Sequence, residues 1–268
     1  MSNEIRVVIT GVAGKMGKET AKAVLNGAPG LRLVGAVDPR EAGVDLGEII
    51  GVPGCEVKVS EHLGEVFAST KADVLVDFTN PQAVLHNAKT ALENGTAPVI
   101  GTTGLDVVGI AELEKLAARS DKAVLIVPNF ALGAVLMMDF ARRAARYFKN
   151  VEIIEMHHDQ KIDAPSGTAL KTAQMIQQQR ESMRQGHPDE YEKLTGARGG
   201  EWEGIRIHSV RLPGLVAHQE VIFGLSGETL TIRHDSLHRE SFMPGVIMAI
   251  RRIGDLKGVV VGLEKILD

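Results

Sequence analysis

The hydrophobic positions in the first part of the chain alternate between short apolar runs and a helical period. Ile5–Thr10 is rich in β-branched residues, and apolar or small residues then recur at helical spacing from Met16 to Val24, until Gly27. Leu31–Val37 is a second apolar run. Short apolar runs are typical of strands buried in parallel sheets. The pattern therefore predicts a strand–helix–strand unit with a right-handed crossover.

The same alternation continues to residue 127. We predict strands at residues 73–78, 97–101 and 123–127. One helix between them is expected to open at Asn80-Pro81 and end at Gly95, and another to cover residues 110–118. Asparagine and proline are favoured at the N-cap and first turn of a helix. Strands that alternate with helices indicate an α/β fold with a doubly wound parallel sheet.

The pattern changes after Asn129. Residues 132–148 have a helical period, and residues 151–156 form a strand-like run. Three further strand-like runs then follow one another, at Ile205–Arg211, 219–225 and 229–234. Successive strands without helices between them predict a smaller α+β domain with a mixed, largely antiparallel sheet.

Two segments near this second domain mark its limits. The end of the polar stretch 177–202 is interpreted as a surface loop, and residues 239–253 as a helix that returns to the first domain. We therefore expect a dinucleotide-binding domain at residues 1–129 plus about 240–268. A substrate-binding and oligomerisation domain is expected at residues 130–239.

Composition excludes several classes of function. The 268 residues include 30 Lys and Arg against 34 Asp and Glu, a net charge of −4, and only seven Phe, two Tyr and one Trp. This balance argues against a nucleic-acid partner. No apolar run approaches the roughly 18 residues of a membrane span, and Met1–Arg6 lacks the start of a secretion signal. With the single cysteine Cys55, these features favour a soluble cytoplasmic protein.

The first strand runs directly into a glycine-rich loop, Gly11-x-x-Gly14-x-x-Gly17. A glycine at the strand end allows a sharp turn, and another lets a pyrophosphate approach the backbone. The third allows the helix to pack closely on the sheet, and the helix N-terminus offers free amides to the phosphates. In a strand–helix–strand context this loop predicts dinucleotide binding.

An acidic residue follows at the expected distance. Asp38 lies 21 residues after Gly17 and ends the second predicted strand. A carboxylate there binds ribose hydroxyls and favours NAD. Lys15 and Arg40 lie nearby and could accommodate the 2′-phosphate of NADP, so the sequence leaves NADH and NADPH both open.

Two further loops follow predicted strands at the carboxyl edge, where open sheets bind ligands. They are Gly101-Thr102-Thr103-Gly104 and Pro128-Asn129-Phe130. Either is a candidate for the nicotinamide end of the cofactor. The alternative is that both are plain strand-to-helix turns.

The densest group of reactive side chains lies between Glu155 and Ala169. It leaves a predicted strand and ends at a helix start, with Ser166 as a good N-cap. Gly167 and Thr168 would present first-turn amides to an anion, and Lys161 adds a positive charge. A small carboxylate substrate suits such a pocket.

The two adjacent histidines, His157 and His158, point to opposite faces if the strand reaches them, so we expect different tasks for them. A zinc site with Asp159 or Asp163 is one alternative, but no cysteine lies nearby and the histidine spacing is unusual for zinc. We expect no metal. A purely structural role for the histidines is the other alternative.

The three motifs together are similar to those of a known family. The glycine loop, Gly101-Thr-Thr-Gly104 and above all His157-His-x-x-Lys161-x-Asp-Ala-Pro-Ser-Gly-Thr168 resemble the dihydrodipicolinate reductases, from about Ile5 to the C-terminus. The resemblance implies a Rossmann-type domain plus a mixed-sheet domain that builds a homotetramer. It also implies reduction of the cyclic dicarboxylate 4-hydroxy-tetrahydrodipicolinate by NADH or NADPH, in the diaminopimelate route to lysine.

The resemblance also implies roles for individual residues. His157 and Lys161 become the candidate proton donors or acceptors, and His158, Gly167 and Thr168 the candidate contacts of a substrate carboxylate. The implied cofactor contacts are Gly11, Val12, Ala13, Gly14, Lys15, Met16, Asp38, Gly101, Thr102, Thr103, Pro128, Asn129, Phe130 and Ala131.

This chain departs from the family pattern at the adenosine end of the cofactor. Members often carry Arg where this chain has Lys15, and Glu-Arg where it has Asp38-Pro39. The alternatives to a reductase of this family are another two-domain dehydrogenase of an amino or semialdehyde acid, and a nicotinamide sensor without turnover.

Overall fold

The computed structural model describes residues 4–181 and 183–267. The chain divides into two compact units. Unit 1 comprises Met1–Phe130 and Phe242–Asp268, and unit 2 comprises Ala131–Ser241. The chain therefore leaves unit 1 after Phe130 and returns to it at Phe242, so that unit 2 is an insertion.

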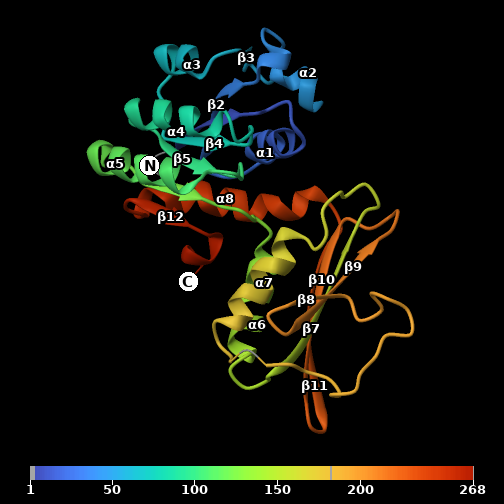
Figure 1. The fold of residues 1–268 in the computed structure, drawn as a ribbon. Helices are drawn as coiled ribbons and strands as arrows, with labels where there is room; N and C mark the ends of the chain where they lie inside the picture. Colours follow the sequence, from blue (N-terminus) through green and yellow to red (C-terminus); the bar gives the residue numbers. More distant parts are fainter. Residues whose placement is uncertain (1–3, 182, 268) are drawn as a thin grey trace. The chain divides into compact units, whose positions relative to one another are not determined.

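Unit 1 is built on a seven-stranded sheet in the order β12-β6-β5-β4-β1-β2-β3, and every pair of neighbouring strands is parallel. In Figure 1 its N-terminal part runs from blue to green and its C-terminal segment is red. The strands are β1 (Ile5–Thr10), β2 (Leu31–Val37), β3 (Val59–Ser60), β4 (Val74–Asp77), β5 (Ala97–Ile100), β6 (Val124–Ile126) and β12 (Val259–Val261). The order 3-2-1-4-5-6 is that of doubly wound dinucleotide-binding folds, to which β12 adds one strand.

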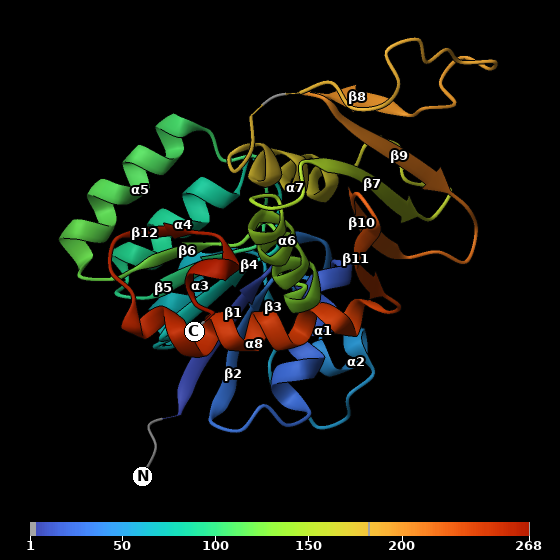
Figure 2. The same ribbon diagram turned by 90° about the horizontal axis from the view of Figure 1, so that it is seen from below.

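Helices cover both faces of this sheet. They are α1 (Lys15–Leu25), α2 (Leu46–Ile50), α3 (Leu63–Ser69), α4 (Val84–Glu93), α5 (Val107–Ser120) and α8 (Met243–Arg252). Unit 1 also contains short 3₁₀ turns at Pro39–Glu41, Ile253–Asp255 and Leu263–Lys265, and a further one, Arg239–Phe242, lies where the chain passes from unit 2 to unit 1. Helices α3, α4 and α5 bury apolar side chains such as Val66, Ala88 and Leu113 against the strands. Helices α1 and α8 lie side by side on the other face (Figure 2), where Thr20 Oγ1 is 3.8 Å from Met243 Sδ.

Unit 2 contains a five-stranded sheet in the order β11-β10-β7-β9-β8. The strands are β7 (Asn150–His157), β8 (Gly200–Trp202), β9 (Ile205–Arg211), β10 (Ala217–Leu225) and β11 (Glu228–Ser236). Only β7 and β9 pair in parallel, and the other three pairs are antiparallel. The sheet is therefore mixed and largely antiparallel, as the sequence predicts.

Two helices, α6 (Leu132–Ala144) and α7 (Gly167–Gln177), cover one face of this second sheet. On that face Ile153, Val221 and Phe223 are fully buried, and Ala173 and Ile176 of α7 are buried as well. Because side chains alternate along a strand, Glu155 and His157 point to the same face as Ile153. The apolar alternation of β7 thus places two polar side chains at the helix-covered end of the strand.

The predicted elements differ from the observed ones in a few places. The end of segment 177–202 was expected to be a loop, but Gly200–Trp202 forms the edge strand β8 by pairing with β9. Asn80 caps a turn through the amides of Gln82 and Ala83, so α4 begins only at Val84. The short elements β3, α2, α3 and β12 were not predicted, because two to seven residues carry too little periodicity.

Gly245 of α8 gives a direct test of how the C-terminal segment packs in unit 1. A Cβ at this position would lie 2.1 Å from the carbonyl oxygen of Phe130. We expect Gly245→Ala to lose about 1–3 kcal/mol of stability through overpacking, lowering Tm by several degrees. Gly254→Ala is the control, because a Cβ there meets no heavy atom within 4 Å. Equal Tm values for the two variants in thermal unfolding would contradict this packing.

Candidate active site

The glycine loop of unit 1 joins β1 to α1. Gly11 has φ of 75°, and a Cβ there would lie 2.3 Å from the carbonyl oxygen of Phe78. A Cβ on Gly17 would lie 2.2 Å from the carbonyl oxygen of Gly11. Helix α1 begins at Lys15 after the N-cap Gly14, without a side-chain cap and without an acidic residue in its first turn. The loop therefore presents a helix N-terminus of the kind that binds phosphate.

Asp38, at the end of β2, is tied to this loop. It is 2% exposed, and its Oδ2 accepts a hydrogen bond of 3.0 Å from the amide of Ala13. The amide, Nε and Nη2 of Arg40 also donate to the carboxylate, at 3.1, 2.9 and 2.9 Å. Burial raises the pKa of Asp38, but the hydrogen bonds from Arg40 and Ala13 outweigh burial and lower it. Asp38, which favours NAD, and Arg40, which could accommodate the 2′-phosphate of NADP, thus form one ion pair.

A cavity of about 810 Å³ lies beside this pair. Its lining includes Thr10, Gly11, Asp38, Arg40, His62 and Asn87. Small-molecule and cofactor sites are typically clefts of about 300–1,000 Å³. The cavity therefore has the size and the polar edge that one half of a dinucleotide needs.

A second buried carboxylate, Asp77, joins the ends of three neighbouring strands of unit 1. It is fully buried at the end of β4, and it accepts hydrogen bonds from the hydroxyls of Thr10 (2.8 Å) and Thr102 (2.6 Å). The Thr79 hydroxyl and the Asn87 amide group also donate to it, each at 2.8 Å. The Thr102 side chain is therefore engaged with the sheet, which leaves its backbone for any contact with a cofactor.

Gly101 is explained by packing among aromatic rings. Phe78 and Phe130 meet in an edge-to-face pair with centroids 5.7 Å apart, and a Cβ on Gly101 would lie 2.3 Å from Phe78 and 2.9 Å from Phe130. Of the other predicted cofactor contacts at this edge, Thr103 and Pro128 are exposed. These residues stay candidate contacts. Val12, Lys15, Met16 and Asn129 lie in the same unit, whereas Ala131 is the N-cap of α6 in unit 2.

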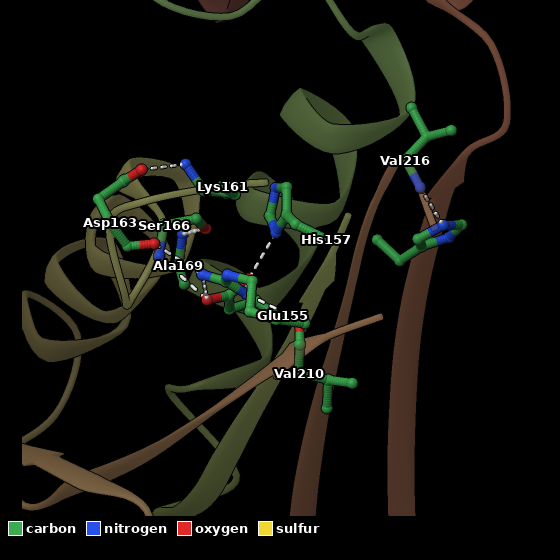
Figure 3. Close-up of polar contacts among 10 residues, drawn as sticks. Glu155, His157, Lys161, Asp163, Ser166, Ala169, Val210 and Val216 are labelled. Atoms are coloured by element: carbon green, nitrogen blue, oxygen red, sulfur yellow. Dashed lines mark hydrogen bonds and ion pairs between the residues drawn. The ribbon is translucent and has the colours of Figure 1, made fainter. Parts of the chain in front are cut away.

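The candidate substrate site of unit 2 is built around Glu155 of β7. This side chain is fully buried, and Oε2 lies 2.5 Å from Nδ1 of His157, two residues further along the same face (Figure 3). Arg211, at the end of β9, donates to both carboxylate oxygens, at 2.7 and 2.9 Å. Burial raises the pKa of Glu155, but hydrogen bonds from His157, Arg211 and Ser209 outweigh burial and lower it to about 2.

The loop after β7 and the start of α7 complete the site. Lys161 Nζ lies 2.6 Å from Asp163 Oδ1, and this hydrogen bond lowers the pKa of Asp163 (Figure 3). Ser166 is the N-cap of α7, since its side chain accepts a hydrogen bond from the amide of Ala169. The amide of Ser166 in turn donates to Glu155 Oε1, at 3.2 Å. Glu155 therefore links His157 to the N-terminus of α7. Lys161 joins the same network, because Arg211 also donates to the carbonyl of Asp163.

The remaining predicted residues of unit 2 lie at the edge of this network. Gly167 is the first residue of α7 and is exposed, and Thr168 follows it. A Cβ on Gly167 would meet no heavy atom within 4 Å. His158 lies just beyond β7, and its carbonyl accepts a hydrogen bond from the amide of Lys161.

Sequence reasoning assigned no role to Glu155, Arg211 or Asp77. A signal was available for Glu155, because residues two apart on a strand share a face, which places it beside His157. Arg211 gave no such signal, since it reaches Glu155 only through the pairing of β9 with β7. Asp77 accepts hydrogen bonds from the side chains of four residues spread between Thr10 and Thr102, a pattern that no local motif carries.

The zinc alternative finds no ligand cluster in the described part of the chain. Within residues 4–181 and 183–267, no three His, Cys, Asp or Glu side chains are grouped so as to hold a metal ion. His157 instead pairs with Glu155, and Asp163 with Lys161.

Within residues 4–181 and 183–267, no helix is both long and apolar enough to cross a membrane.

Comparison with known proteins identifies the family. A family model described as dihydrodipicolinate reductase, N-terminus, matches residues 5–130, and one described as dihydrodipicolinate reductase, C-terminus, matches residues 133–267. The chain belongs to the dihydrodipicolinate reductase family. The two matched regions together span both units and every candidate site residue outside Ala131.

Individual relatives agree with this membership. The 4-hydroxy-tetrahydrodipicolinate reductase of Syntrophomonas wolfei is 54% identical over 267 residues, covering 100% of both chains. That of Desulfitobacterium hafniense is 52% identical over 270 residues, covering 99% of both. A dipicolinate-bound dihydrodipicolinate reductase from Paenisporosarcina sp. TG-14 is 48% identical, with a TM-score of 0.89 over 98% of this chain and 99% of that one.

More distant structures share the fold alone. An amine dehydrogenase from Mycobacterium smegmatis has a TM-score of 0.69 at 17% identity, covering 97% of this chain and 96% of its own. The two-unit architecture is thus shared with other dehydrogenases. The full-length identity to reductases of the family separates this chain from the alternative of another two-domain dehydrogenase.

The low pKa of Glu155 predicts a dependence of stability on pH. Its folded-state pKa of about 2 lies below its ordinary value of 4.5, so its contribution is full above pH 4.5 and is lost as the pH falls towards 2. Between pH 6 and pH 3, the stability of the wild type relative to Glu155→Gln should fall by about 2 kcal/mol. Denaturant unfolding of both proteins at the two pH values measures this. A difference that is the same at both would contradict the assignment.

Proposed function

We propose that the chain reduces 4-hydroxy-tetrahydrodipicolinate to tetrahydrodipicolinate with NADH or NADPH, in the diaminopimelate route to lysine. The observation that carries the reaction is full-length identity above 50% to reductases of this name. The geometry supports separate roles for the two units. Unit 1 holds the cofactor, and the network around Glu155 in unit 2 handles the substrate.

The residues of unit 1 fit a dinucleotide. The uncapped start of α1 offers amide donors to the pyrophosphate, and the cavity beside Asp38 accepts the adenosine half. We assign cofactor contacts to the segments Gly11 to Met16, Gly101 to Thr103 and Pro128 to Ala131. When bound, a reduced nicotinamide supplies the hydride for the reaction.

The ion pair of Asp38 and Arg40 bears on the choice between NADH and NADPH. The carboxylate of Asp38 already accepts four hydrogen bonds, three of them from Arg40. To bind ribose hydroxyls, as in NADH, Asp38 has to release the Arg40 side chain, which is 69% exposed and has room to move. The released guanidinium, with Lys15, then suits a 2′-phosphate. This geometry supports use of both cofactors.

The start of α7 suits a substrate carboxylate. The solved relative from Paenisporosarcina carries dipicolinate, a planar cyclic dicarboxylate. We assign one carboxylate of the substrate to the amides of Gly167 and Thr168, with His158 as a further contact. The open space where a Cβ of Gly167 would lie supports a close approach of the ligand to the backbone.

His157 and Lys161 are the proposed proton donors or acceptors. His157 is only 15% exposed at its side chain, and its Nδ1 is held by Glu155. Lys161 carries a positive charge beside the exposed Asp163. As hydride reaches the ring, a neighbouring cation or acid neutralises the negative charge that develops on its nitrogen side.

We further propose a homotetramer in the cytoplasm. The face of the second sheet opposite α6 and α7 carries the half-buried apolar residues Ile154, Met156 and Ile222, which suits an interface between copies. The single cysteine Cys55 is free and buried, which suits a reducing compartment.

The decisive test of the function is loss of absorbance at the reduced-nicotinamide band. The substrate is made freshly by the preceding synthase, and NADH and NADPH are run in parallel. Oxidation that depends on the synthase product supports the proposal, and the ratio of kcat/KM values measures cofactor preference. Cofactor binding without any oxidation would overturn it in favour of a nicotinamide sensor.

Replacing Lys161 tests the proposed proton transfer. We expect Lys161→Ala to lower kcat by roughly 10² or more, because positioned acid catalysis contributes about 10²–10⁴. Affinity for NADH should stay at the wild-type value. Lys171→Ala removes an exposed lysine of α7 and serves as the control. Near-normal turnover of Lys161→Ala in steady-state kinetics would contradict the role.

Replacing Gly167 tests the carboxylate contact. The structure leaves open space for the added methyl group, and alanine favours a helix over glycine, so Gly167→Ala should fold with an unchanged or higher Tm. The methyl group should nevertheless obstruct the substrate and raise KM several-fold. An unchanged KM in a correctly folded variant would count against a substrate contact at this position.

A further inference from the structure

Glu155 has a position that the reaction itself does not explain. It lies on β7, two residues before His157, and its side chain is fully buried. A side chain without access to solvent has no direct route to the substrate, so any effect of Glu155 on the reaction passes through the groups that it holds.

The first of these groups is the imidazole of His157. An ionised carboxylate only accepts hydrogen bonds, so the short contact of 2.5 Å places the proton on Nδ1 of the ring. The contact engages Nδ1 of the ring and not Nε2. The carboxylate thereby fixes the ring tautomer and leaves Nε2 as the atom that exchanges a proton.

The second group is the loop that bears Lys161. Arg211 holds Glu155 with both terminal nitrogens, and its Nη2 also donates to the carbonyl of Asp163, at 2.8 Å. Asp163 in turn pairs with Lys161, at 2.6 Å. The carboxylate therefore reaches the lysine through one arginine and one backbone carbonyl.

The third group is the N-terminus of α7. Glu155 Oε1 accepts from the amide of Ser166, the N-cap that precedes Gly167 and Thr168. One buried carboxylate thus contacts His157 and Ser166 directly and Lys161 through Arg211. These are the separate parts of the chain to which proton transfer and carboxylate binding are assigned.

We propose that Glu155 is a positioning residue, which sets the tautomer of His157 and holds the Lys161 loop and the start of α7 in register. The expected loss of kcat rests on the proposed function, whereas the effect of Glu155 on the His157 ring can be measured without turnover. Glutamine tests it well, because its amide oxygen can still accept from Arg211 and Ser166. Its amide nitrogen, when turned to His157, donates to Nδ1 and moves the ring proton to Nε2.

The strand supplies a matched control on its other face. Glu152 of β7 also pairs with an arginine and a histidine: its carboxylate lies 2.5 Å from Arg198 Nη2 and 2.8 Å from His208 Nε2. It holds none of the assigned residues. Glu152→Gln therefore removes the same charge from the same kind of cluster, and we expect it to leave the His157 ring unchanged.

The experiment records two-bond ¹H–¹⁵N correlations of histidine-labelled protein at about pH 9, with His157 assigned by its loss in His157→Gln. We expect the Nδ1–H form in the wild type and in Glu152→Gln, and the Nε2–H form or a mixture in Glu155→Gln. In the kinetic assay, Glu155→Gln should lower kcat by roughly 10², with NADH affinity unchanged. Glu152→Gln should keep wild-type kcat.

Each outcome bears on the proposal. An Nε2–H ring in the wild type overturns it, even if Glu155→Gln fails to fold. An Nδ1–H ring that persists in folded Glu155→Gln overturns it as well, as does an equal loss of kcat in Glu152→Gln. The wild type could fail to turn over the synthase product while the His157 ring still changes from the Nδ1–H form in Glu155→Gln. The proposed reaction would then be wrong, and the positioning of His157 by Glu155 would stand.

Discussion

An ionised carboxylate remains buried in a folded protein only when hydrogen-bond donors surround it, and the candidate substrate site depends on this constraint. Glu155 has no access to solvent, and donors from β7, β9 and the start of α7 converge on its two oxygens. The cost of burying the charge is offset only while all of these segments stay in place. The requirement to satisfy one side chain thereby fixes the relative positions of His157, the Lys161 loop and the α7 N-terminus.

Unit 1 contains two further buried carboxylates that are surrounded by hydrogen-bond donors. Asp77 accepts hydrogen bonds from hydroxyl and amide donors at the ends of neighbouring parallel strands, where the loops proposed to bind the cofactor begin. Asp38 collects the amide of Ala13 and the side chain of Arg40 beside the glycine loop. Buried carboxylates in both units therefore hold the connections that follow the strands of the parallel and the mixed sheet.

The sequence predicted the longer strands and helices well because their apolar periods span enough residues to be distinctive. It also brought out the reactive block from His157 to Thr168, since helix-cap chemistry and charge are local properties. Arg211 could not be assigned to the site in this way. Its contact with Glu155 depends on the parallel pairing of β9 with β7, and the register of a strand pair across 56 residues leaves no local pattern. The edge strand β8 was missed for a similar reason, because its three residues are ordered by pairing with β9 rather than by their own apolar pattern.

The central claim is that unit 2 binds a cyclic dicarboxylate on which a nicotinamide held by unit 1 acts. Calorimetric titration with pyridine-2,6-dicarboxylate, with and without saturating NADH, tests it most directly, because a cofactor and a substrate mimic of the same reaction should influence each other's affinity. The account predicts a lower Kd for the dicarboxylate when NADH is bound. An identical Kd in both titrations, or no binding of the dicarboxylate in either, would contradict it.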